Sequence, residues 1–223
     1  MGSDFWKWLI HSNGGLMLRV GVGAAIFAAM TVADYRRHGP AARRWREYVF
    51  LLAAAGIAIL YGLVNDQLTV SISWEYFYYG KGIDQVIGIE PPPMGALRWE
   101  AFKIGLKATW TAGLVAGVVL LMANNPSRRR PQLPMKTLYR LLAIMLIGPI
   151  IGGIVGGLLG RAGLPARFSA ELADLVRLNL WRPGQFQCVY GIHLGGYVGG
   201  LAAMVAAAVW IRWKRWRLWS AMA

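Results

Sequence analysis

Few residues in this 223-residue chain have the types and spacing that chemistry requires. Asp66 and His193 adjoin long apolar stretches. An ionisable side chain is expensive at membrane depth and is by default a functional hypothesis there. Asp66, Gln67, Glu75 and His193 therefore form our candidate polar outer site, which could bind a solute or carry a proton. The alternative for His193 is a structural histidine with satisfied hydrogen bonds.

Metal chemistry has weaker support. Cys188 and His193 lie five residues apart, but a zinc site usually needs three or four ligands, and only Glu75 or Asp66 offers a third. We predict no metal and no cofactor, with Cys188 and His193 as weak candidates. The sequence also lacks the GxSxG, HExxH, GxxxxGK and CxxC motifs, so the reactions that depend on them have no support.

The composition indicates what must position these residues. The chain is 57% hydrophobic and 15% charged, with a mean hydropathy of +0.43, whereas soluble domains are about 45–50% apolar and about 25% charged. A bilayer core needs helices of about 20 mostly apolar residues. We predict an all-α membrane protein, a single membrane domain over 1–223 with short extramembrane segments. Five spans are expected, at about 16–33, 49–64, 106–123, 141–160 and 192–211.

The basic residues predict the orientation of the chain. They cluster after the first, third and fifth apolar blocks, and short cytoplasmic loops are enriched in Lys and Arg. We therefore expect the N-terminus outside, the C-terminus inside, and outside segments at 66–103 and 161–191. The clusters predict contact with anionic lipid rather than nucleic acid, because they lie beside span ends. Their members are Arg36, Arg37, Arg43, Arg44, Arg46, Arg128, Arg129, Arg130, Lys136, Arg140, Arg212, Lys214, Arg215 and Arg217.

Glycines recur every four residues in the last two spans. This spacing puts small residues on one helix face and lets two backbones approach closely in lipid. We predict that spans four and five pack together, with Pro149 bending span four. The alternative is that these faces accept a partner helix or slide during a transport cycle. The predicted packing residues are Gly152 and Gly156 in span four and Gly195 and Gly199 in span five.

An aromatic cluster follows the second span. Trp74, Tyr76, Phe77 and Tyr78 could anchor the chain at the membrane interface or form a partner-docking surface, since aromatic residues are enriched at binding hot spots. The alternation of apolar and polar residues over 68–74 predicts extended structure. Segments 5–10 and 172–178 are amphipathic and predict helices on the outer membrane surface.

One stretch resembles a known group of proteins. YGLVNDQLTVSISWEYF, from Tyr61 to Phe77, resembles an element of uncharacterised multi-pass bacterial membrane proteins, and ATWTAGLVAGV, from Ala108 to Val118, is similar to the helix that follows it there. The resemblance implies a bacterial inner-membrane location and supplies no activity. It draws attention to Asp66, Gln67, Thr69, Glu75, Tyr76 and Phe77.

The sequence therefore favours a non-enzymatic subunit or accessory of a larger membrane complex, with protein partners in the bilayer. The first alternative is a small-solute transporter or channel with a polar outer vestibule around Asp66, Glu75 and His193. A metal-dependent membrane enzyme is the least favoured interpretation.

Overall fold

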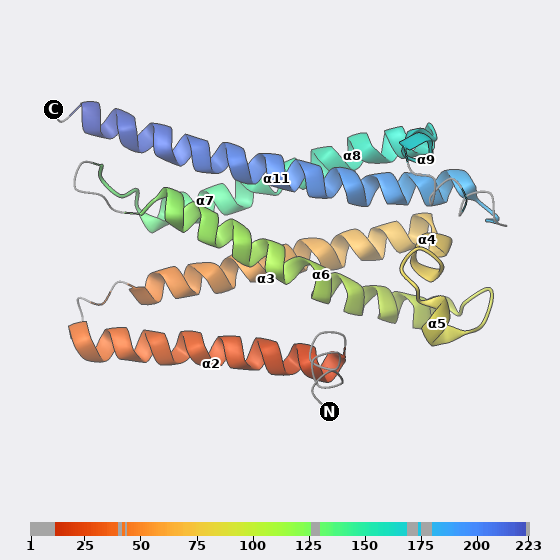
Figure 1. The fold of residues 1–223 in the computed structure, drawn as a ribbon, viewed down its shortest axis with the longest axis horizontal. Helices are drawn as coiled ribbons and strands as arrows, with labels where there is room; N and C mark the ends of the chain where they lie inside the picture. Colours follow the sequence, from red (N-terminus) through yellow and green to blue (C-terminus); the bar gives the residue numbers. More distant parts are fainter. Residues whose placement is uncertain are drawn as a thin grey trace. The chain divides into compact units, whose positions relative to one another are not determined.

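The computed structural model describes residues 12–39, 42, 44–125, 130–168, 174 and 180–221. Within these ranges the chain is helical and contains no β-strand (Figure 1). The expected surface helices at 5–10 and 172–178 fall on residues that lie, apart from Asp174, outside this description. The helices are α2 (Asn13–His38), α3 (Arg44–Ile72), α4 (Trp74–Tyr78), α5 (Asp84–Ile87), α6 (Met94–Ala123), α7 (Met135–Met145), α8 (Ile147–Arg161), α9 (Leu164–Phe168) and α11 (Pro183–Ser220).

Among the described residues, five helical segments are long and apolar enough to cross a membrane, as the sequence predicted. They are Met17–His38, Arg44–Ile72, Met94–Ala123, Met135–Arg161 and Pro183–Ser220. The fourth comprises α7 and α8, which are separated at Leu146. This interruption lies close to Pro149, which cannot donate a backbone hydrogen bond within the helix.

The expected extended structure over 68–74 is wrong, because α3 continues to Ile72. Leu68 and Ile72, four residues apart, are exposed, whereas Thr69 and Val70 are buried. A helix with a lipid-facing side produces this pattern. Over such a short stretch, the order of apolar and polar residues is compatible with the two-residue period of a strand and with the period of a helix.

The chain divides into two compact units, one up to Ala53 and one from Ala54 onward. In the first unit, Phe27 of α2 stacks on Tyr48 of α3 with 5.7 Å between ring centres. Asp34 is buried, and its Oδ2 accepts a 2.9 Å hydrogen bond from the backbone nitrogen of Arg44. This carboxylate satisfies a donor at the start of α3, where helices leave their first N–H groups unpaired.

Glycine contacts hold the second unit together, as predicted for spans four and five. The helices α8 and α11 run side by side (Figure 1). A Cβ added to Gly152 would lie 2.2 Å from the carbonyl oxygen of Gly195, and one added to Gly156 would lie 2.0 Å from that of Gly191. Gly199 meets Gly148 in the same way, at 2.2 Å. No side chain fits between these backbones.

A second small-residue contact, between α3 and α6, was not predicted. A Cβ added to Gly113 would lie 2.4 Å from the carbonyl oxygen of Ala54, and Gly62 faces Thr109 and Gly105. Ala54, Ala58, Gly62 and Asp66 follow one another at intervals of four. This spacing is the same signal that the glycine pairs carry, and it places Asp66 on the face of α3 that packs inward.

A buried arginine binds the C-terminal end of α6 and the segment that follows it. Arg215 of α11 is 5% exposed, so its expected position with the guanidinium directed at lipid phosphate is wrong. The guanidinium instead donates hydrogen bonds to the carbonyls of Ala123, Asn125, Arg130 and Pro131, at 2.6 to 3.2 Å. It thereby serves acceptors at and beyond the C-terminus of α6, which carries the negative end of the helix dipole.

Candidate functional site

The candidate site is built on the inward faces of α3 and α11. Asp66 and His193 are 5% and 8% exposed, and His193 Nε2 lies 3.8 Å from Asp66 Oδ1. Thr69, one turn after Asp66, places its Oγ1 3.4 Å from the same nitrogen. The Thr69 hydroxyl donates to the carbonyl of Asn65 at 2.7 Å, so it offers a lone pair to His193. The tautomer with hydrogen on Nε2 therefore suits both neighbours.

Two aromatic rings from α4 fix the imidazole. Tyr76 stacks on His193 with ring centres 4.9 Å apart and planes at 17°, and Phe77 meets it edge-on at 5.9 Å. Both rings are buried. Burial raises the pKa of Tyr76, with Tyr197 and Asp66 adding to the effect, so Tyr76 keeps its proton and presents a neutral surface to the imidazole.

The four predicted site residues divide into two groups. Asp66 and His193 come together as described, whereas Gln67 turns to α6. Its Nε2 donates to the carbonyl of Arg98 at 3.0 Å, and its Oε1 accepts from Arg98 Nη1 at 3.2 Å. Gln67 therefore links α3 to α6 and is not part of the Asp66–His193 pair.

Glu75 also lies apart from the pair. It is 1% exposed, and its carboxylate accepts hydrogen bonds from the backbone nitrogens of Trp181, at 2.5 Å, and Arg182, at 3.1 Å. These donors immediately precede α11, where negative charge is favourable. The role that the geometry gives Glu75 is to hold the start of the helix that carries His193.

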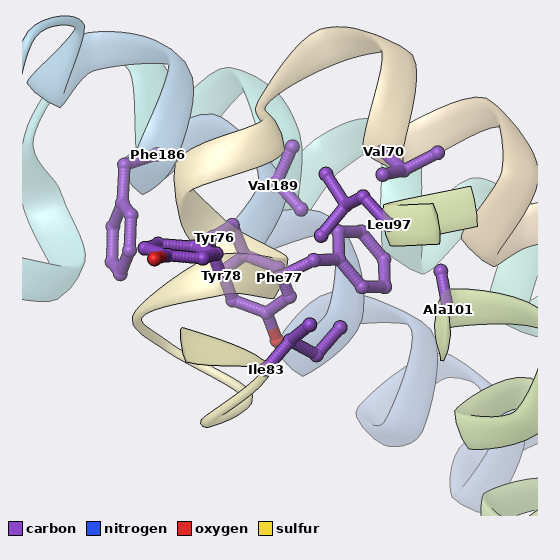
Figure 2. Packing of buried hydrophobic residues seen from close by; sticks show 9 residues of the cluster. All are labelled: Val70, Tyr76, Phe77, Tyr78, Ile83, Leu97, Ala101, Phe186 and Val189. Carbon is purple, nitrogen blue, oxygen red and sulfur yellow. The ribbon is translucent and has the colours of Figure 1, made fainter. Parts of the chain in front are cut away.

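The structure does not support the docking surface expected after the second span. Tyr76, Phe77 and Tyr78 are 5%, 0% and 4% exposed, and they form the centre of the hydrophobic core shown in Figure 2. Their neighbours come from α3, α6 and α11, including Val70, Leu97 and Phe186. Trp74, the fourth residue of the expected surface, is partly buried and packs against the same core. Density of aromatic residues along the sequence does not distinguish a packed core from an interface anchor or a docking surface.

The two weak metal candidates lie on different faces of α11. A Cβ added to Gly157 would lie 3.7 Å from Cys188 Sγ, so the thiol faces α8, whereas His193 faces α3 and α4. Within the described ranges, no three His, Cys, Asp or Glu side chains gather as a metal site would require.

A cavity of about 520 Å³ adjoins Asp66 and His193. Its polar lining also includes Tyr61, Asn65, Lys81 and Tyr197, together with Thr109 and Thr111 of α6. Along the rest of its length the wall is mainly small and apolar, from α3, α6, α7 and α11. Representative residues of this wall are Ala54, Ile57, Ala58, Ala108, Ala112, Val115, Leu142, Gly200, Leu201 and Met204.

Lys81 supplies the positive charge of the polar end. Its Nζ lies 5.4 Å from the centre of the Tyr76 ring, within the range of a cation–π contact. Burial lowers the pKa of Lys81, while the negative charge of Asp66 acts in the opposite direction. Nothing in the sequence singles out Lys81, but Tyr61 and Asn65, and likewise His193 and Tyr197, share a helix face by their four-residue spacing.

The fold and site together define a polytopic α-helical membrane protein with a polar-ended cavity among its helices. The chain matches no family model, and neither the curated proteins nor the solved structures include a significant match. The functional argument therefore rests on the geometry of the site.

Proposed function

We propose that this protein binds a small molecule in the cavity beside Asp66 and His193, as a small-solute carrier would. The observation that supports this most directly is the combination of a 520 Å³ cavity with a buried pair of ionisable residues 3.8 Å apart at one end. Small-molecule sites are typically cavities of about 300–1,000 Å³, mostly apolar, with a few convergent polar groups.

The buried polar residues elsewhere strengthen this choice by contrast. Asp34, Glu75 and Arg215 each serve backbone groups at a helix end, which explains their burial by structure alone. Asp66 and His193 lie inside their helices, where the helix satisfies its own backbone. Their burial beside a cavity is therefore better explained by a ligand.

A matched pair of glycine substitutions tests the proposal. A Cβ added to Gly200, which lines the cavity, would meet only Pro149 Cβ at 3.9 Å, and one added to Gly56, which does not line it, would meet nothing within 4 Å. We expect Gly200→Phe to fill the cavity and Gly56→Phe to leave it open. Protein purified in mild detergent would be extracted and its bound small molecules measured by mass spectrometry.

We expect wild type and Gly56→Phe to retain the same small molecule and Gly200→Phe to hold at least about fivefold less of it, a loss of about 1 kcal/mol in affinity. Equal amounts in all three proteins, with Gly200→Phe unfolding at the wild-type temperature, would contradict the proposal.

A role as subunit of a larger bacterial inner-membrane complex is our second candidate. It is favoured by Trp181, which is 65% exposed and packs edge-on against Trp74 with ring centres 6.0 Å apart. Exposed tryptophans are common anchors in protein interfaces, although they also occur at the membrane surface. A partner that co-purifies with wild type and is lost from Trp181→Ala would support this role, and a lone monomer would count against it.

A further inference from the structure

The lining of the cavity includes apolar and aromatic residues of the spans that are more than half exposed. Val115 of α6 and Tyr197 and Leu201 of α11 all line the cavity, and they are 54%, 58% and 59% exposed. All three belong to segments long and apolar enough to cross a membrane. A ligand dissolved in the bilayer could therefore enter sideways without passing through water.

The polar end balances its charges. Asp66 is the carboxylate and Lys81 the ammonium group in the lining, and His193 is an uncharged imidazole when it carries one hydrogen. A head with a net charge would leave either Asp66 or Lys81 opposed by a like charge in a poorly hydrated place, which is unfavourable. A neutral head that donates and accepts hydrogen bonds could instead use both groups, together with Tyr61 and Asn65.

The shape of the cavity sets the length of the ligand. Its lining on α3 runs from Ala54 to Asp66, which at 1.5 Å per residue is about 18 Å along the helix axis. On α11 it runs from His193 to Met204. Beyond the polar end this wall offers little but apolar contact, so it suits a hydrocarbon chain.

We propose that the cavity takes a long-chain, lipid-soluble molecule whose polar head carries no net charge. The head lies between Asp66 and Lys81, and the chain runs along the apolar wall past Gly200 toward Met204. This inference rests on the proposed function and names the class of molecule that the same site would bind.

Photolabelling of the whole protein in phosphatidylcholine nanodiscs tests the class. The probe is 1-dodecanol carrying a diazirine near the end of its chain, with the labelled residues mapped by mass spectrometry. Unlabelled 1-dodecanol, dodecanesulfonate and dodecyltrimethylammonium compete, so that chain length is constant and the head is neutral, anionic or cationic. We expect labels on cavity residues of α6 or α11, and competition by dodecanol at concentrations at least about tenfold lower than by either ion.

Charge substitutions test the placement of the head. Asp66→Asn leaves Lys81 uncompensated and should make dodecanesulfonate the strongest competitor. Lys81→Met leaves Asp66 uncompensated and should favour dodecyltrimethylammonium. The double variant should restore the preference for dodecanol, a reversal that general loss of folding would not produce. Gly200→Phe should abolish the label, whereas Gly56→Phe should keep it.

The outcomes separate this inference from the proposed function. Preference of the wild type for a charged competitor, or labelling of lipid-facing residues alone, would overturn the inference. If such a result accompanied a small molecule lost only from Gly200→Phe, the cavity would still be a binding site for another class of ligand. Absence of both the label and the retained molecule would overturn the two proposals together.

Discussion

At the scale of single residues, burial of a polar side chain has two different causes in this protein. Arg215 is buried because it bonds to backbone carbonyls, whereas Asp66 and His193 are buried beside a cavity. The sequence identified Asp66 and His193 from their position near apolar blocks. It misplaced Arg215, because a basic residue after a span is normally an orientation signal and its backbone partners lie about 90 residues away along the chain.

The role of Arg215 can be checked by substitution. Arg215→Leu removes charge-assisted bonds to four carbonyls at and beyond the end of α6. Each such bond contributes about 1.5–3 kcal/mol in favourable settings. Because water can replace some of them, we expect a net loss of about 2–4 kcal/mol, seen as a lower Tm in mild detergent. Arg212→Leu, at an exposed position of the same helix, should change Tm little. Similar effects of both would argue against the capping role.

Lys81 predicts how ligand preference depends on pH. Burial lowers its pKa, so Lys81 loses its charge at a lower pH than an ordinary lysine. The charged or titratable groups near it are Asp66 of α3, Tyr76 of α4 and His193 of α11.

Above the pKa of Lys81, the negative charge of Asp66 is uncompensated. Competition by dodecyltrimethylammonium, whose charge is fixed, should therefore strengthen as pH rises, while that by dodecanesulfonate weakens. Lys81→Met should already show the high-pH preference at neutral pH, and an unchanged preference across the range in wild type would refute this assignment.

At the scale of helices, composition predicted the spans and their ends were the main error. The second span was expected at 49–64, but α3 covers Arg44–Ile72. The polar residues after Val64 looked like the start of a loop, because the sequence does not reveal that Asp66 and Thr69 meet His193. The third span was expected to start at 106, but α6 begins at Met94. The polar residues before 106 looked like part of a loop, because the sequence does not reveal that Arg98 donates a hydrogen bond to Gln67 of α3.

The glycine contact between α8 and α11 gives a prediction at this scale. A Cβ at Gly156 would lie 2.0 Å from the carbonyl oxygen of Gly191, whereas one at Gly153 would lie 3.4 Å from that of Ile192. Gly156→Ala must separate the helices and should lower the free energy of unfolding by about 2 kcal/mol or more, of the order found for overpacked cores.

Gly153→Ala is the control on the same helix. The added Cβ lies at an ordinary contact distance, and alanine exceeds glycine in helix propensity by up to about 1 kcal/mol. The Tm of this variant should therefore stay near or above that of wild type. If Gly156→Ala were tolerated equally well in thermal unfolding, the close packing of these two helices would be refuted.

At the scale of the whole molecule, the net charge of +14 serves chiefly as an orientation signal in our interpretation. The basic clusters follow the first, third and fifth spans. In a five-span chain the ends of these three spans all lie on the same side of the membrane. In the same interpretation, Asp66, Glu75 and Asp84 belong to the other side, and Asp66 lines the cavity. The strong total charge therefore gives little information about the ligand, whose site is nearly neutral.

Labelling of single cysteines in intact cells tests this orientation. With Cys188→Ala as background, Val86→Cys places a thiol on α5, where Val86 is 67% exposed, and Ser220→Cys places one at the exposed end of α11. Because Lys and Arg are retained on the cytoplasmic side, a membrane-impermeant maleimide should label position 86 in intact cells and position 220 only after permeabilisation. The opposite pattern would place the polar end of the cavity on the cytoplasmic side, and equal labelling of both positions in intact cells would be incompatible with five spans.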